Sequence, residues 1–137
     1  MMDYVLVAVG GAAGSVLRYA LGAWGGAAWG GSFPWATILI NMTGSLLIGA
    51  VGAVTIGDGL LPSGAVLRLL VMVGFCGGYT TFSSFSLQTL DLVRDGRPGA
   101  ALLNVALSLL FCLAAVAAGY YAGSWLGARV LAVRQAP

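Results

Sequence analysis

Residues 74–86 read GFCGGYTTFSSFS, and this stretch decides how the rest of the chain is organised. Gly77 and Gly78 stand side by side in an apolar segment, where each glycine costs a helix about 1 kcal/mol relative to alanine. The pattern predicts a break in a membrane helix at 77–80. Broken backbone is tolerated at bilayer depth only where protein or a polar cavity accepts its free groups. We therefore expect an ion or substrate site here, since hydroxyl residues crowd around the break: Tyr79, Thr80, Thr81, Ser83, Ser84 and Ser86.

The composition is that of an integral membrane protein. Of the 137 residues, 60% are hydrophobic and 7% are charged, too few polar side chains to cover a water-soluble globule. We expect one all-α transmembrane domain over residues 1–137. The net charge of +2 is scattered and indicates no nucleic-acid surface. The first apolar run is preceded by the acidic Asp3 and by no basic residue, so we expect a membrane span there and not a cleaved signal peptide.

Four windows have the roughly 20 apolar residues that a membrane helix needs, at 3–23, 34–56, 64–93 and 98–127. The break at 77–80 falls in the middle of the third window. Short connections are expected at 24–33, 57–63 and 94–97. The sequence therefore predicts a four-helix bundle with a broken third helix.

Polar and aromatic side chains in the first three spans leave two interpretations open. Arg18 either extends to the membrane interface or attracts anions at a pore mouth. Asn41 either bonds to a neighbouring helix or faces a site. Phe82 and Phe85 share a helix face, where packing is the ordinary explanation. Beside them lies a polar stripe of Thr81, Ser84 and Gln88.

The fourth span has one weakly polar track. Asn104, Ser108 and Cys112 follow one another at four-residue steps and so share one side of the helix. Interhelical hydrogen bonding and a pore lining would use the same geometry. Cys112, like Cys76, lies in an apolar run and is interpreted as a small buried side chain.

The arginines do not fix the direction of insertion. Positive residues normally gather on the cytoplasmic side, but three arginines are expected on each side of the membrane. One copy could therefore insert either way, and two opposite copies could form an antiparallel homodimer. The side of the termini has Arg68, Arg129 and Arg134, and the other has Arg18, Arg94 and Arg97.

Three motifs give the chain a specific resemblance. GGAAGSVLRY lies in the first span, ILINMTGSLLIG in the second and GFCGGYTTFSSFS in the third. With them the chain resembles the CrcB/Fluc family of fluoride channels over nearly its whole length. The resemblance implies a dual-topology antiparallel homodimer in a bacterial inner membrane, with two fluoride pathways and a structural sodium ion at the dimer centre.

The resemblance also implies residue roles. The backbone carbonyls of Gly77 and Thr80 from both copies would hold sodium. Asn41 would donate its amide to fluoride, and Phe82 and Phe85 would present their ring edges. Asn104 and Cys112 depart from the hydroxyl or tyrosine side chains that family members often have on the fourth span. Further hydroxyls on the route would come from Thr81, Ser84 and Ser108.

The implied function is passive export of fluoride that entered as HF. A proton-coupled exporter of cationic compounds is the main alternative, but it needs a carboxylate deep in the membrane. Glutamate is absent, and every aspartate is expected near a span end. A non-transporting subunit would leave the break unexplained. We expect no enzyme, because the chain has no histidine, buried acid or phosphate-binding loop.

Overall fold

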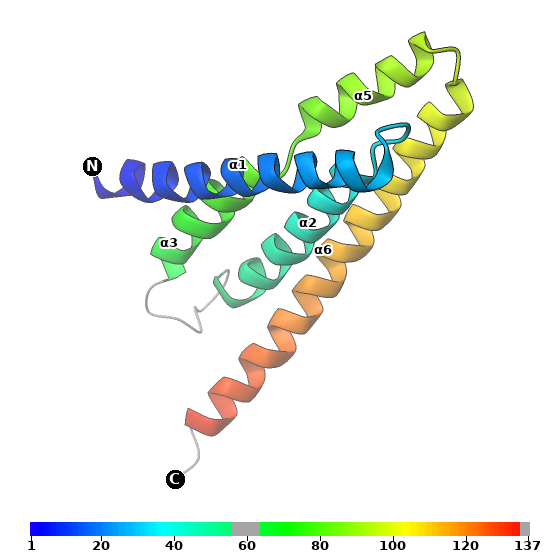
Figure 1. Ribbon diagram of the computed structural model, residues 1–137. Helices are drawn as coiled ribbons and strands as arrows, with labels where there is room; N and C mark the ends of the chain where they lie inside the picture. Colours follow the sequence, from blue (N-terminus) through cyan, green and yellow to red (C-terminus); the bar gives the residue numbers. More distant parts are fainter. Residues whose placement is uncertain (56–63, 135–137) are drawn as a thin grey trace.

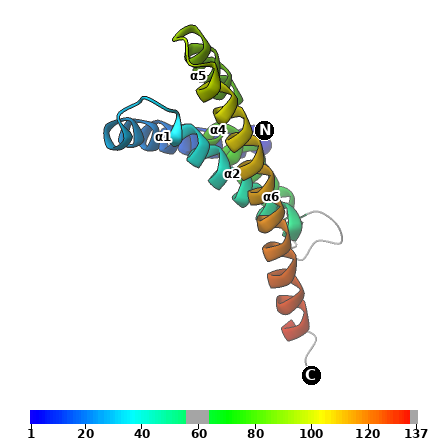
Figure 2. The same cartoon turned by 90° about the vertical axis from the view of Figure 1, so that its right-hand side faces the viewer.

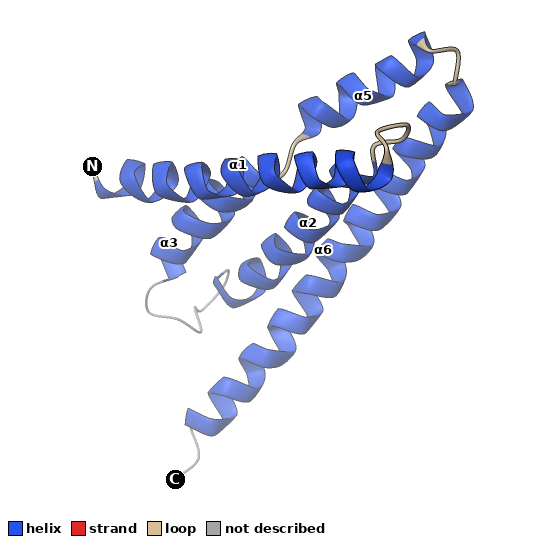
Figure 3. Ribbon diagram, in the orientation of Figure 1, coloured by secondary structure: helices blue, strands red, loops and turns tan. Residues whose placement is uncertain are grey.

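The computed structural model describes residues 1–55 and 64–134, which form helices joined by short turns (Figures 1 and 3). Four helical stretches are long and apolar enough to cross a membrane, which confirms the all-α membrane fold. The chain is a multi-pass membrane protein. The elements are α1 (Met2–Trp29), α2 (Trp35–Thr55), α3 (Gly64–Leu67), the π-helical η1 (Arg68–Cys76), α4 (Gly77–Tyr79), α5 (Phe82–Arg94) and α6 (Pro98–Arg134).

Two helices extend further than the sequence indicated. The expected connection at 24–33 is wrong in its first half, because α1 continues to Trp29. It ends where Gly30 adopts a left-handed φ of 71° and donates its N–H to the Gly26 carbonyl at 3.1 Å. Helix α6 continues past 127 to Arg134, so that its 37 residues extend about 55 Å. The expected connection at 57–63 lies outside the described residues.

Helices α2 and α6 run side by side in the same direction (Figures 1 and 2). Glycines allow their backbones to approach. A Cβ atom on Gly49 would meet the Val116 carbonyl, and one on Gly119 would meet the Leu46 carbonyl. Because lipid removes the usual hydrophobic drive for association, close packing through small residues is what holds such a pair together.

Helix α1 crosses the third span through a second set of glycines. A Cβ atom on Gly14 would overlap the Phe75 carbonyl and lie 2.8 Å from the Tyr79 nitrogen. From the other side, a Cβ atom on Gly78 would meet the Gly11 carbonyl. Gly78 therefore serves close helix packing.

The third span is interrupted later than predicted. Gly77 has helical angles, φ −62° and ψ −37°, and the helix continues through Tyr79. The chain becomes extended at Thr80, with φ −79° and ψ 158°, and at Thr81, with φ −152° and ψ 108°. The break at 77–80 is thus corrected to 80–81, the loop segment just before α5 in Figure 3. Both glycines stay helical, and α1 packs closely against Gly78, whereas a Cβ atom on Gly77 would meet nothing within 4 Å.

Helix α5 leans away from α1 after the interruption (Figure 1). Leu92 is its one buried residue among those described. At its end Gly96 takes a left-handed φ of 73°, and the chain turns back into α6. In the single chain one face of α5 next to the interruption is open, with Phe82, Ser83, Ser86 and Leu87 exposed.

Candidate functional site

A groove of ≈ 390 Å³ opens beside the interruption of the third span. We call it the central groove. Its walls come from α2, from the end of η1 with the interruption, from the start of α5 and from α6. Ser84, Asn104 and Arg18 are not among its lining residues. Of the residues that the sequence singled out, the groove contains Asn41, Cys76, Gly77, Thr80, Thr81, Phe82, Phe85, Ser108 and Cys112.

Asn41 holds the interruption in place. Its Oδ1 accepts a hydrogen bond from the Thr81 N–H at 2.8 Å, and its Nδ2 donates to the Thr81 carbonyl at 3.2 Å. In a continuous helix the Thr81 N–H would donate to the Gly77 carbonyl. One amide side chain thus replaces helical hydrogen bonds at the break. Nδ2 carries two protons, and its second proton has no partner among the described residues.

Thr81 caps the second half of the span. Its Oγ1 accepts from the Ser84 N–H at 3.1 Å, which is an N-cap bond for α5. The same hydroxyl donates to Ser84 Oγ at 3.0 Å. Ser84 therefore faces the cap and reaches the central groove only through Thr81.

The interruption also frees carbonyl oxygens. Within the described part of the chain, no donor reaches the carbonyls of Gly77 and Thr80, and both residues line the central groove. Thr80 turns its own hydroxyl back to the Cys76 carbonyl at 2.8 Å. Two unpaired carbonyls beside one groove suit a hard cation such as sodium. The two carbonyls thus fit the metal that the resemblance implied.

Arg18 has a role that neither expectation described. Its Nε donates to the Gly78 carbonyl at 3.0 Å, and Ser15 Oγ lies 3.5 Å from the same oxygen. In a continuous helix this carbonyl would accept from residue 82. The guanidinium sits at the C-terminal end of α4, where a positive charge is favourable. Arg18 therefore stabilises the broken end of the first half-helix.

Phe82 and Phe85 both border the central groove. Their ring centroids are 5.4 Å apart and the ring planes are inclined by 49°. The Phe82 side chain is 77% exposed in the single chain. An exposed ring beside a groove is not ordinary core packing, and its edge carries the positive part of the aromatic quadrupole.

The polar track on α6 divides into two parts. Ser108 and Cys112 line the central groove, and the buried Ser108 Oγ has no partner among the described residues. Asn104 is buried too, but its Nδ2 donates to Thr89 Oγ1 on α5 at 2.8 Å. Asn104 thus makes the interhelical hydrogen bond that the sequence suggested, while Ser108 and Cys112 border the groove.

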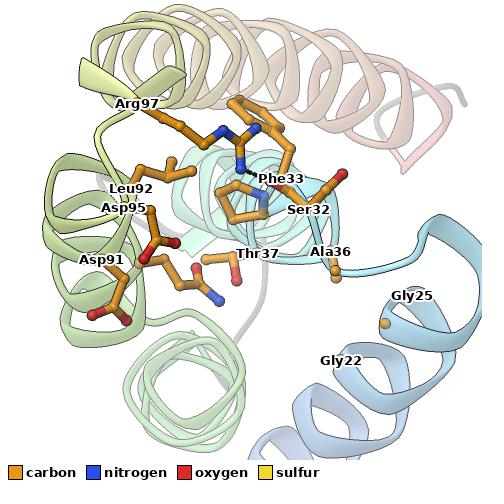
Figure 4. A pocket seen from close by; sticks show the side chains of 14 residues that line it. Gly22, Gly25, Ser32, Phe33, Ala36, Thr37, Asp91, Leu92, Asp95 and Arg97 are labelled. Carbon is orange, nitrogen blue, oxygen red and sulfur yellow. Dashed lines mark hydrogen bonds between the residues drawn. The ribbon is translucent and has the colours of Figure 1, made fainter. Parts of the chain in front are cut away.

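A second cavity of ≈ 330 Å³ lies between the end of α5 and the turn after α1 (Figure 4). Asp91, Asp95 and Arg97 border it, and Arg97 Nη1 donates to the Ser32 carbonyl at 2.7 Å. Gln88, predicted in one stripe with Thr81 and Ser84, lies in this cavity instead of the central groove. The predicted stripe is therefore divided, with Thr81 at the central groove and Gln88 at the second cavity.

One contact near the site escaped sequence reasoning. The Tyr79 hydroxyl lies 2.9 Å from Thr43 Oγ1, which links the buried end of α4 to α2. Thr43 also bonds to the Leu39 carbonyl at 2.8 Å. The two residues are 36 positions apart, so no local pattern could have paired them.

An interrupted membrane helix beside a partly polar groove defines a class, the helical membrane proteins that conduct or transport ions. Residues 5–120 match the family described as CrcB-like protein, Camphor Resistance (CrcB). The chain belongs to this family.

Several relatives that match most of the chain have the name "Fluoride-specific ion channel FluC". The protein of that name from Rhodospirillum rubrum is 51% identical over 126 residues, which cover 92% of each chain. Those from Methylocella silvestris and Methylobacterium radiotolerans are 49% and 48% identical, over 92% of this chain and 90% and 88% of theirs. These names confirm the resemblance found in the sequence.

Proposed function

We infer that this chain forms a fluoride-selective channel that lets cytoplasmic fluoride leave passively. The observation that carries this function is the central groove, in a chain about half identical to proteins named for fluoride conduction. Fluoride is small and strongly hydrated, so a selective path replaces its water with short donors and excludes larger anions by width.

The groove supplies donors of the right kind. Asn41 has a free Nδ2 proton, and Ser108 has an unpaired hydroxyl. The ring edges of Phe82 and Phe85 add weaker positive contacts. Helix α5 also begins here, and a helix N-terminus carries about half a positive charge. Each of these groups favours an anion.

A proton-coupled exporter is not favoured. Its relatives would not be named for fluoride, and it needs a carboxylate within the membrane. Among the described residues, Asp3 lies at the start of α1, while Asp91 and Asp95 lie at the end of α5. Asp58 lies outside the described residues.

We further propose that two copies assemble as an antiparallel homodimer. Phe82 is 77% exposed, and the open face of α5 needs cover. Three arginines were expected on each side of the membrane, which supports insertion in both directions. The Gly77 and Thr80 carbonyls of two copies would hold one sodium ion at their common axis. Bound there, sodium would neutralise the carbonyl dipoles and fix the two copies together.

The decisive experiment measures fluoride and chloride efflux from liposomes containing the purified protein. We expect fast fluoride efflux with chloride retained, and loss of fluoride efflux in Phe85→Ile and Phe82→Ile with the oligomeric state unchanged. Full activity in both variants would contradict the assignment of the rings to the pathway. Equal chloride efflux would contradict fluoride selectivity.

A further inference from the structure

We propose that Asn104 is a positioning residue for the central groove, acting through Thr89 on the turn of α5 that carries Phe85. This inference rests on the proposed function, because it explains how one wall of that pathway is held. It gives a role to the buried amide of α6, which does not itself line the groove.

The hydrogen bonds have one direction only. Thr89 Oγ1 donates to the Phe85 carbonyl at 2.7 Å, so its proton is already used. Its oxygen can then only accept, and Asn104 Nδ2 donates to it at 2.8 Å. The amide group of Asn104 is thereby fixed toward α5. A chain of two hydrogen bonds connects α6 to the backbone of Phe85.

This contact sets the register of the two helices. The chain reverses at Gly96 and Arg97, so α5 and α6 are antiparallel neighbours. Asn104 and Thr89 are about equally far from that turn along the chain. Ser108 and Phe85 each lie one helical turn further from the turn at Gly96 and Arg97, again at equal distances along the chain. Both line the central groove. Pairing Asn104 with Thr89 therefore places Phe85 opposite Ser108.

One other pair of buried residues has the same register. Leu92, the buried residue of α5, and the buried Ala101 of α6 are also equally far from the turn along the chain. Within the described residues, the bond from Asn104 to Thr89 is the one side-chain hydrogen bond between α5 and α6. It lies between the turn and the groove, in a setting where burial strengthens a hydrogen bond.

The test uses Thr89→Val and Asn104→Leu, which keep the side-chain size and remove the link. Ser86→Ala is the matched control for the spectroscopic measurement at position 85, because Ser86 bonds to the Phe82 carbonyl at 2.9 Å on the exposed side of α5, and no partner on α6 is found among the described residues. Thr89→Ser restores the hydroxyl. We expect the first two variants to slow fluoride efflux about tenfold, the factor that corresponds to about 1.4 kcal/mol of lost interaction.

Three further results distinguish positioning from a general loss of stability. The double variant should be no slower than either single variant, because both remove the same link. Thr89→Ser should retain wild-type efflux. With a fluorinated phenylalanine at position 85, the ¹⁹F resonance should shift or broaden in Asn104→Leu and remain unchanged in Ser86→Ala.

The spectroscopic measurement separates this inference from the proposed function. If the wild-type protein released no fluoride, the proposed function would fail while the ¹⁹F resonance still tested the register. Wild-type efflux in Thr89→Val, additive effects in the double variant, or an unchanged resonance in Asn104→Leu would each overturn the positioning role.

Discussion

Replacing Asn41 tests whether one side chain maintains the interruption of the third span. Asn41→Leu keeps the volume and removes both hydrogen bonds to the Thr81 backbone, at 2.8 and 3.2 Å. Each backbone group left unpaired and out of water costs about 1–3 kcal/mol, so we expect a loss of about 2–6 kcal/mol of unfolding free energy. Asn41→Asp keeps the acceptor for the Thr81 N–H but places a second oxygen near the Thr81 carbonyl. It should lose at least about 1–3 kcal/mol.

Unfolding in mixed micelles with increasing sodium dodecyl sulfate, followed by tryptophan fluorescence, measures these losses. Ser45→Ala is the control: Ser45 lines the same groove one helical turn along α2, and its hydroxyl bonds to no described residue. It should change the unfolding free energy by less than about 0.5 kcal/mol. Both Asn41 variants should also slow fluoride efflux. If Asn41→Leu were as stable as Ser45→Ala, the interruption would not depend on this amide.

Three other perturbations address packing, sodium and orientation. Gly14→Ala should lower the free energy of unfolding by about 1–3 kcal/mol, because its Cβ atom would overlap the Phe75 carbonyl. Gly22→Ala, where the Cβ atom would enter open space, should raise the free energy of unfolding by up to about 1 kcal/mol. Equal melting temperatures of the two variants would argue against the close α1 contact. Replacing sodium with a large organic cation should weaken the dimer in cross-linking and slow fluoride efflux, and indifference to sodium would count against a site at Gly77 and Thr80. Two lysines added to the C-terminal tail should bias insertion and lower efflux; undiminished efflux from uniformly oriented protein would refute the antiparallel arrangement.

The helices could be predicted from the sequence because hydropathy and length alone define membrane spans. The position of the interruption could not. Gly77 and Gly78 looked like the break, since glycine is a poor helix former. What decides the position is Asn41, which captures the backbone of Thr81 from 40 residues away. Gly78 instead allows the backbone of α1 to pack closely against the third span.

The sequence predicted that the candidate site residues lie close together, but it did not predict their hydrogen-bond partners. Phe82, Phe85 and Ser108 line one groove, as the resemblance implied for a shared pathway. Arg18 was considered only for its charge, and its bond to the Gly78 carbonyl depends on the crossing of α1 with α4. Ser84 was expected to add its hydroxyl to the route, and in the structure its Oγ accepts from the Thr81 hydroxyl beside the cap of α5. Such contacts follow from tertiary structure and leave no periodic signal.

The length of α6 provides a place to attach a marker protein. At about 55 Å it exceeds the hydrocarbon thickness of about 30 Å, and near its end the Arg129 guanidinium lies 4.1 Å from the centre of the Trp125 ring. A soluble marker domain fused in helical phase to these last turns would be carried rigidly by the bundle. In electron micrographs, such markers on both sides of a single particle would make opposite insertion directly visible.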